Sequence, residues 1–209
     1  MEKVRWQIAV ATNGEASVRQ AVDGDGVAIA VMLARAFHDD PVFAWLIPDD
    51  AARAARLPKL FALFFRTDGP AGMRLVTGGG EAASLWRAPG RASTGAVETV
   101  RAAWPLVRIF GLRLPRAFAV SEAIEAHFPA GPFWYLHIAG CDPAHQGKGL
   151  GGAAVRAGLE RAAGRLPAYL ETAKERNLPF YQRLGFEVTS EWQVPGGGPR
   201  FWSMTRPAD

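Results

Sequence analysis

The chain has 209 residues, of which 49% are hydrophobic, 21% charged and 11% aromatic, enough apolar material for one globular domain with a core. Its single cysteine, Cys141, excludes an internal disulfide framework and a zinc site built from several thiolates. The formal net charge is +4, but the arginines are scattered, so we expect no nucleic-acid partner. The apolar runs are too short for a signal peptide or a membrane-spanning helix, so we expect a cytoplasmic protein with no membrane partner.

The first half of the chain predicts a mixed order of strands and helices behind an N-terminal extension over 1–15. The expected elements are a strand at 17–22, a helix at 27–37, a short apolar turn at 43–47, a helix at 51–66 and a strand pair at 73–77 and 81–86. The residues whose helical spacing predicts the first helix are Val27, Val31, Ala34 and Phe37. We expect residues 16–209 to form one domain.

The second half begins with a helical insert over about 93–128, interrupted at Pro105 and Pro115. The elements expected after it are a buried strand at 133–141, a helix at 149–163, a strand at 168–171, a short helix at 178–184 and two strands at 186–194 and 201–205. This order predicts a mixed α/β fold with a strand–loop–helix–strand unit at its centre.

The most informative motif is a glycine-rich turn between the buried strand and the next helix. It contains Gly147, Gly149, Gly151 and Gly152. Glycines let the main chain approach a ligand closely, and a helix start directs free N–H groups and a partial positive charge at it. The turn therefore predicts a site for a phosphate or pyrophosphate, to which Lys148 can add a charge.

Two other phosphate-binding motifs were compared with this turn. A Walker loop is excluded, because Gly147-Lys148 is followed by Gly149 rather than by Ser or Thr. The segment does match G-x-G-x-x-G, and Glu171 lies where a ribose-binding acid is expected, so a dinucleotide-binding oxidoreductase stays as an alternative. Against it, the turn lies some way beyond the strand, and the chain does not continue in parallel crossover units.

The segment Gln146–Gly151 resembles the Gln/Arg-x-x-Gly-x-Gly/Ala signature of the GNAT N-acetyltransferases. The segments 170–172 and 177–187 resemble the second motif of that family, and the hairpin over 194–206 resembles its puromycin N-acetyltransferase branch. The resemblance implies a mixed, mostly antiparallel sheet that is splayed at its middle strands and flanked by helices. It also implies direct transfer of an acetyl group from acetyl-CoA to a primary amine of a small molecule, with antibiotic-like amines among the acceptors that it suggests.

The resemblance further implies where the co-substrate acetyl-CoA binds. Its pantetheine arm would pair with the main chain at Ala139, Gly140 and Cys141, with Gly140 permitting a bulge. The main-chain amides implied for the pyrophosphate are those of Gln146, Gly147, Lys148, Gly149, Leu150, Gly151 and Gly152. Asn177 is implied to contact the cofactor, and by itself also has the pattern of a helix N-cap.

Tyr181 matches the tyrosine of the family that protonates the leaving thiolate; on local pattern alone it is equally a buried core tyrosine. Glu171 is the expected general base, with a salt bridge to Lys174 or Arg176 as the alternative. Many family members use no dedicated base. We interpret His137 as a core histidine turned away from the cleft.

Other site chemistry is weakly indicated. A covalent acetyl-enzyme on Cys141 is a minor alternative, because a small buried residue explains that position. The histidines and nearby carboxylates lack a metal-ligand spacing, so no metal is expected. A catalytically inactive acyl-CoA sensor is the alternative outside enzymes, since it would keep the glycine turn without needing Tyr181.

The acceptor side of the site is expected to come from the insert and from the region around residues 37–47. The insert, with Trp104, Phe110 and Phe118, is interpreted as a lid that selects the amine, or as a dimer interface, so the protein is expected to be a monomer or homodimer. Phe43 and Trp45 are interpreted as an aromatic wall of the acceptor site or as core that anchors a helix.

Overall fold

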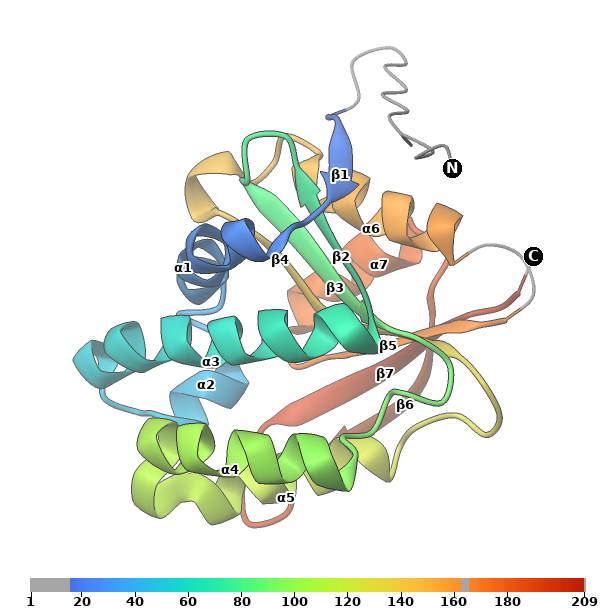
Figure 1. Ribbon diagram of the computed structural model, residues 1–209. Coiled ribbons are helices and arrows are strands. Elements are labelled where there is room, and N and C mark those ends of the chain that lie inside the picture. Colours follow the sequence, from blue (N-terminus) through green and yellow to red (C-terminus); the bar gives the residue numbers. More distant parts are fainter. Residues whose placement is uncertain (1–15, 163–165, 209) are drawn as a thin grey trace, which may run out of the picture.

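The computed structural model describes residues 16–162 and 166–208, which form a seven-stranded sheet flanked by helices (Figure 1). The extension expected over 1–15 lies outside the described residues. The strands are β1 (Val18–Gln20), β2 (Gly72–Thr77), β3 (Ala82–Arg87), β4 (Trp134–Cys141), β5 (Ala168–Thr172), β6 (Glu187–Gln193) and β7 (Arg200–Arg206). The α-helices are α1 (Gly26–Ala36), α2 (Pro41–Leu46), α3 (Asp50–Ala71), α4 (Ala96–Phe110), α5 (Leu114–Glu125), α6 (Leu150–Arg161) and α7 (Leu178–Gln182). No described helix is long and apolar enough to cross a membrane.

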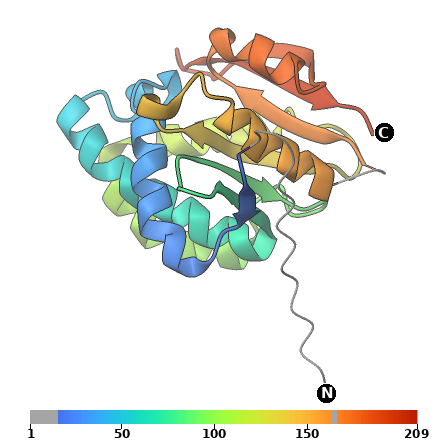
Figure 2. The same ribbon diagram turned by 90° about the horizontal axis from the view of Figure 1, so that it is seen from above.

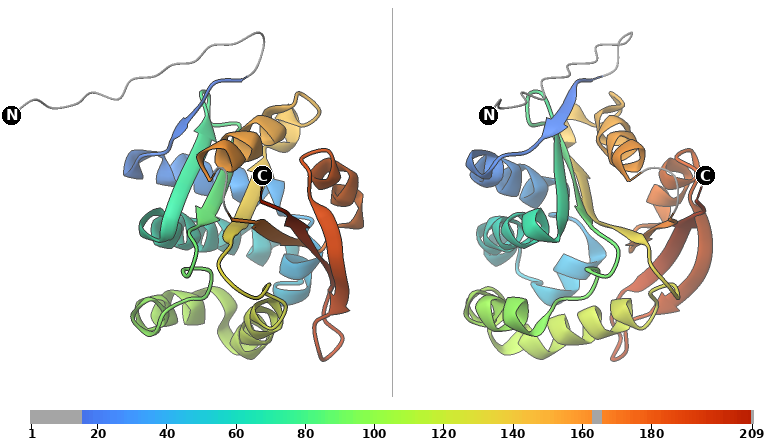
Figure 3. Two further views of the ribbon diagram at one scale, coloured as in Figure 1. Left: turned by 90° about the vertical axis from the view of Figure 1, so that its right-hand side faces the viewer. Right: turned by 45° about the vertical axis from the view of Figure 1, so that its right-hand side comes forward.

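The sheet has the strand order β1-β2-β3-β4-β5-β7-β6, and β4–β5 is its parallel pair. That pair is short: its register consists of Trp134↔Ala168 and Tyr135↔Tyr169. Beyond these residues β4 and β5 separate, and Figure 3 shows β6 and β7 leaning away from β2, β3 and β4. The mixed, mostly antiparallel, splayed sheet is thereby confirmed. The dinucleotide-binding alternative is contradicted, because that fold needs a series of parallel crossovers.

The helices cover the two faces of the first sheet half unequally. Helices α1 and α3 pack together on one face, and α6 lies on the other (Figures 2 and 3). The alternation of β3 explains this arrangement: Leu85 packs with α1 and α3, whereas Ser84 donates its hydroxyl hydrogen to the carbonyl oxygen of Ala154 in α6, at 2.8 Å. Helices α4 and α5, the predicted insert, lie below α3 in Figure 1.

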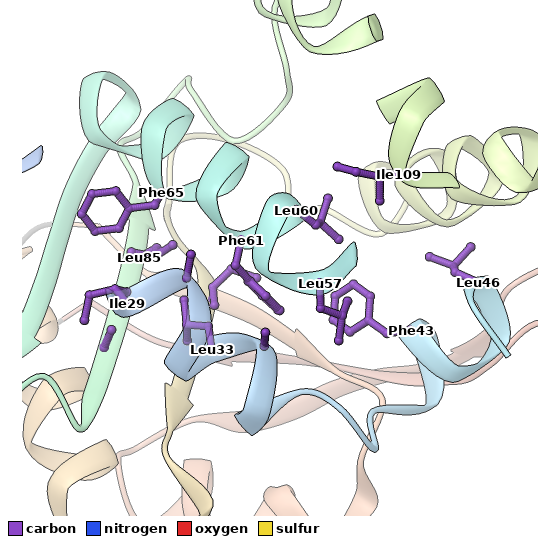
Figure 4. Close-up of a cluster of buried hydrophobic side chains, with 14 of the residues drawn as sticks. Ile29, Leu33, Phe43, Leu46, Leu57, Leu60, Phe61, Phe65, Leu85 and Ile109 are labelled. Atoms are coloured by element: carbon purple, nitrogen blue, oxygen red, sulfur yellow. The ribbon is translucent and has the colours of Figure 1, made fainter. Parts of the chain in front are cut away.

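The main hydrophobic core lies between α1, α2, α3 and β3 (Figure 4). Its labelled members are Ile29, Leu33, Phe43, Leu46, Leu57, Leu60, Phe61, Phe65, Leu85 and Ile109. Burying one such side chain contributes about 1.5–3 kcal/mol to folding, so this cluster fixes the three helices against the sheet. It forms the floor on which the candidate site is built.

The residues whose spacing predicts α1 divide between its two faces: Ala34 is buried and Phe37 packs against the core, but the two valines do not. Ile29, Ala30 and Leu33 are buried, whereas Val27 is 78% exposed and Val31 is also exposed. Both sets have helical spacing, so the periodicity allowed either face, and contact with α3 decided between them.

Two predicted breaks did not form. The turn predicted at 43–47 is helix α2, because Asp40 accepts a hydrogen bond from the N–H of Val42 at 3.0 Å and Pro41 occupies the first turn, an N-cap arrangement. Pro105 does not interrupt the insert but lies inside α4, whereas Pro115 is in the first turn of α5. Helix α4 continues through Pro105 because it buries Ile109 and Phe110 beyond it.

A β-bulge in β4 lies three residues before the predicted position. Leu85 pairs with Ile138 and Trp86 with Leu136, so His137 is the extra residue. Gly140 is regularly paired with Ala83 instead. A Cβ at Gly140 would lie 2.6 Å from Leu33 Cδ2, so glycine is needed there for the close approach of α1.

Candidate active site

A cavity of about 460 Å³ lies between the helical insert and the middle of the sheet. Its walls are apolar where α2, α3, α4 and α5 contribute, and they include Phe37, Phe43, Phe64, Phe110, Phe118 and Phe201. The polar side chains that β4, β5 and the following segment contribute are Tyr135, His137, Glu171, Thr172, Asn177 and Tyr181. An apolar hollow with a few convergent polar groups is typical of a small-molecule site.

Glu171 presents a buried carboxyl group to this cavity from β5. Its Oε1 accepts a hydrogen bond from the Tyr135 hydroxyl, and its Oε2 is buried with no partner among the described residues. Burial raises the pKa of Glu171 to about 7, against the opposing effect of the Tyr135 hydrogen bond. A carboxyl group with this pKa exchanges protons near neutrality, as a general base must.

The alternative role for Glu171, a salt bridge, is contradicted by the ion pairs of its neighbours. Lys174 Nζ lies 2.6 Å from Asp39 Oδ1, and Arg176 lies 2.9 Å from Asp39 Oδ2. Both cations are therefore engaged by the segment after α1, and Glu171 faces the cavity without them.

Tyr181 reaches the same cavity from α7. Its side chain is buried, so both interpretations of this residue hold: it packs edge-on against Phe180 and Phe186, and it lines the cavity. Burial, reinforced by the negative charges of Glu171 and Asp40, raises the pKa of Tyr181. Its hydroxyl group is therefore protonated at neutral pH and can serve as a proton donor.

His137 does not turn away from the cleft, because it lines the cavity. It is nevertheless satisfied as a core histidine would be, since its Nδ1 lies 2.7 Å from Oδ2 of the buried Asp68 in α3. A β-bulge lies at this residue of β4. Tyr135, Asp68 and this bulge were not predicted; only the Tyr135-x-His137 spacing along one strand could have drawn attention to them.

The glycine turn has the backbone that the sequence predicts. Gly147 and Gly149 have φ angles of +78° and +80°, and α6 begins directly afterwards at Leu150. These conformations favour glycine, and the first N–H groups of α6 have no partner within the helix. Asp142 stabilises the start of the turn, because its side chain accepts hydrogen bonds from Arg35 and from the N–H of Ala144.

The predicted cofactor residues fall into two groups. Ala139, Asn177 and Tyr181 line the cavity, whereas the described lining contains none of the residues 146–152. The turn follows the C-terminal end of β4, and among the described residues the pairing of β4 with β5 ends at Tyr135. Asn177 is the N-cap residue of α7, as its pattern predicts, but its side chain makes no cap bond and instead contacts Thr172 Oγ1 at 3.4 Å.

Cys141 lacks the environment of a nucleophile. Burial raises the pKa of its thiol, which disfavours the reactive thiolate. Its Sγ contacts the carbonyl oxygen of Asp142 at 3.7 Å, and its own carbonyl accepts a hydrogen bond from the Gln146 side chain at 3.2 Å. Across residues 16–162 and 166–208, no group of three or more His, Cys, Asp or Glu side chains is arranged to hold a metal ion.

The aromatic residues proposed for the acceptor side separate into lining and outer residues. Phe43, Phe110 and Phe118 line the cavity. Trp104 is 68% exposed and does not belong to the described cavity lining, so it does not contribute to the acceptor side. Trp45 lies under the guanidinium of Arg116, at 4.9 Å from its ring centroid, rather than in the cavity wall.

Comparison with known proteins gives consistent relatives. Residues 115–186 match the model of the acetyltransferase (GNAT) family. A solved structure of a histone acetyltransferase HPA2 and related acetyltransferase from Corynebacterium glutamicum is 29% identical, with a TM-score of 0.70 over 92% of this chain and 96% of that one.

Two further solved structures share the fold at lower identity. The polyamine N-acetyltransferase of Drosophila melanogaster, which forms N-acetylagmatine, is 17% identical, with a TM-score of 0.58 over 92% of this chain and all (100%) of that one. The arylalkylamine N-acetyltransferase 2 of Aedes aegypti is 11% identical, with a TM-score of 0.57 over 92% of this chain and 98% of that one.

Proposed function

We propose that this chain, which has the GNAT fold, is an N-acetyltransferase that acetylates the primary amine of a small molecule with an apolar body, using acetyl-CoA. The observation that carries the proposal is the meeting of Glu171 and Tyr181 in one apolar cavity, beside the point where β4 and β5 separate. One group can accept a proton near neutrality and the other can donate one.

Acceptor chemistry is supported by the charges around the cavity. The carboxylates that line it are Asp40, Glu98, Glu122, Glu125 and Glu171, whereas Arg87 is the lining arginine among the described residues. Glu98 is paired with Arg87, and burial raises the pKa of Asp40 and Glu171, so the lining is rich in carboxyl groups rather than uniformly charged. This lining contrasts with the net charge of +4 of the whole chain and favours a cationic ligand, as an amine is before it reacts. The phenylalanine walls favour an aryl or alkyl body on that amine.

Donor binding is supported by the turn and by the free edge of β4. The main-chain groups near Ala139, Gly140 and Cys141 would pair with the pantetheine arm, and the amides over 146–152 would hold the pyrophosphate. Asn177 and Tyr181 lie where the donor arm would reach the cavity. The thioester would then face the amine across the separation of β4 and β5.

The proposed reaction is a direct transfer. Glu171 takes a proton from the acceptor ammonium, directly or through water, and the freed nitrogen attacks the thioester carbonyl carbon. The C–N bond forms, the C–S bond breaks, and Tyr181 protonates the departing thiolate. Hydrogen-bond donors directed at the oxyanion of the tetrahedral intermediate also lower the barrier of such reactions. We assign this role to a main-chain N–H of the bulged strand β4.

The acceptor itself is proposed only as a class. The hairpin β6–β7 resembles that of the puromycin N-acetyltransferase branch, and the chain is proposed to lie near that branch. The helical insert is proposed to select the acceptor, because its residues supply much of the cavity wall. We further propose that the protein acts in the cytoplasm as a monomer or homodimer.

The proposal is tested by binding and turnover together. Calorimetry should detect acetyl-CoA binding and no NADPH binding. Release of free CoA thiol should then be measured with phenylethylamine, hexylamine, agmatine, spermidine, puromycin and glucosamine. We expect turnover with the apolar-bodied amines. Acetyl-CoA binding without turnover of any amine would favour the sensor, and NADPH binding would overturn the donor assignment.

A further inference from the structure

Four charged or titratable side chains from four different elements form one connected series of contacts beside the cavity, and three of them, Arg87, Glu98 and His137, line it. Glu98 of α4 pairs with Arg87 of β3, Arg87 Nε lies 3.5 Å from Oδ1 of Asp68 in α3, and Oδ2 of Asp68 accepts from His137 Nδ1 of β4 at 2.7 Å. Asp68 is completely buried and Arg87 is 4% exposed. The connection therefore runs from the helical insert to a histidine that lines the cavity.

This connection fixes how the imidazole ring is presented. A carboxylate only accepts hydrogen bonds, so the hydrogen of neutral His137 must lie on Nδ1, toward Asp68. The other ring nitrogen, Nε2, then carries a lone pair on the side of the ring away from Asp68, and His137 lines the cavity. Asp68 would also stabilise the imidazolium if Nε2 took a proton, since the pair then becomes ionic.

The connection lies close to Glu171. The Tyr135 ring contacts the His137 ring, with 5.5 Å between centroids, and the Tyr135 hydroxyl donates to Glu171. A positive charge on His137 acts on Glu171 and lowers its pKa, so the two groups lie within electrostatic reach. The Tyr135 hydroxyl occupies Oε1 of Glu171, and Oε2 has no partner among the described residues, so a proton taken up by this carboxyl group needs a second group in the cavity to receive it.

We propose that His137 is a proton-relay residue of this site, with Asp68 as its positioning residue. The acceptor ammonium gives a proton to Glu171, and the proton passes through cavity water to Nε2 of His137. The resulting imidazolium releases it to solvent, which restores both groups for the next turnover. The inference rests on the proposed acetyl transfer, and it gives the buried Asp68–Arg87 pair a function beyond holding the last turn of α3.

Charged and polar groups from several elements face His137. These are Asp68 from α3, Arg87 from β3, Tyr135 from its own strand and Glu171 from β5, with Glu98 of α4 acting through Arg87. Removing the relay should matter most where the acceptor is almost entirely protonated. Alkyl amines lose their proton near pH 10, roughly as lysine does, so the relay becomes dispensable as that pH is approached.

The test compares His137→Gln with His127→Gln across pH, using thiol release with the best amine of the panel. His127 lies outside the cavity, stacked on Trp192, and controls for loss of a histidine as such. We expect kcat/KM of H137Q to fall about 100-fold at neutral pH, and the deficit to shrink toward high pH. A profile like that of the wild type, or a deficit that is the same at every pH, would overturn the relay.

Asp68→Asn, which keeps the size of the side chain, tests the positioning role. We expect its deficit to shrink toward high pH in the same way, whereas damage to folding alone would lower activity equally across the range. Urea unfolding of each variant, and acetyl-CoA affinity by calorimetry, establish that the fold and donor site persist. A wild-type protein that turns over no amine would contradict the proposed function. An active wild type together with an unaffected H137Q variant would contradict only the relay.

Discussion

Burial raises the pKa of both Glu171 and Tyr181, with opposite chemical consequences. For Glu171 the shift brings the pKa to about 7, so that the carboxylate becomes a stronger base that can still be ionised at neutral pH. For Tyr181 the shift keeps the hydroxyl protonated. The same desolvation thus prepares one group to accept a proton and the other to donate one.

Tyr181→Phe removes the proposed proton donor and leaves the ring in place. We expect kcat to fall about 100-fold, because the thiolate must then leave without a proton. The KM for acetyl-CoA should change little, since the aromatic packing is retained. Thiol-release kinetics measure both values, and an unchanged kcat would assign the acid elsewhere.

Glu171→Gln tests the burial of the carboxyl group through stability. Between about pH 4.5 and 7 the native protein holds a proton on Glu171 that the unfolded chain has lost, so the free energy of unfolding should fall as pH rises through this window. The loss attributable to this group is at most about 3 kcal/mol. Urea unfolding at several pH values should show a smaller pH dependence in E171Q. Equal slopes for the two proteins would contradict the raised pKa.

At the scale of elements, the proposed site has a donor side at the turn between β4 and α6 and an acceptor side at the insert α4–α5. The turn depends on main-chain conformation, so its side chains are free to vary while its glycines are not. The insert depends on side-chain shape, because α4 and α5 contribute to the cavity wall. The two elements should therefore respond to mutation in different ways.

Gly149→Ala places a Cβ on a residue with φ of +80°, and Gly197→Ala does the same at +74° in the β6–β7 loop. Both sites have open space around the added atom, so both should lose about 1 kcal/mol of stability to backbone strain. Only G149A should weaken acetyl-CoA binding, by at least several-fold in calorimetry. Equal affinity in the two variants would contradict a donor site at the turn.

Phe118→Ala and Trp104→Ala each remove one aromatic side chain of the insert, the first from the cavity lining and the second from the exposed surface. Phe118 lines the cavity, whereas Trp104 is exposed outside. We expect F118A to change the kcat/KM ratio between bulky and small amines by about tenfold, as loss of a pocket contact does. W104A should leave that ratio as in the wild type. The same kcat/KM ratio in both variants would contradict a role of the insert in acceptor specificity.

At the scale of the whole molecule, the sheet must stay rigid although its middle strands separate. Helix α6 contributes to this by lying tightly on β3. Trp86 is completely buried, and its indole Nε1 donates to Ser84 Oγ at 3.0 Å; Ser84 in turn bonds the α6 main chain. A Cβ at Gly158 would lie 2.3 Å from Trp86 Nε1, so glycine sets the distance between helix and sheet.

Gly158→Ala should therefore lower the free energy of unfolding by about 1–3 kcal/mol, because the added methyl group forces α6 away from the sheet. Gly24→Ala is the matched control, since nothing lies within 4 Å of its added Cβ. Urea unfolding compares them, and equal stability of G158A and G24A would show that α6 can shift freely.

Much of the fold could be predicted because its signals are local. The apolar run before Cys141, the glycines after it and the Asn177–Glu187 motif each lie within one short stretch of chain. Strand and helix periodicity, turn glycines and the family motif are all properties of such stretches. The predicted strands and the backbone of the glycine turn follow from them.

What only the tertiary structure decided depends on residues far apart in the chain. Asp68 and His137 are 69 positions apart, and Tyr135 and Glu171 are 36 apart, so no local pattern joins them. The buried face of α1 likewise depends on its contact with α3. Gly140 must lack a Cβ because that atom would lie too close to Leu33. Local sequence determined which elements form and where the main chain can bend; packing between distant elements determined which side chains share a buried, weakly solvated space, and with it their proton chemistry.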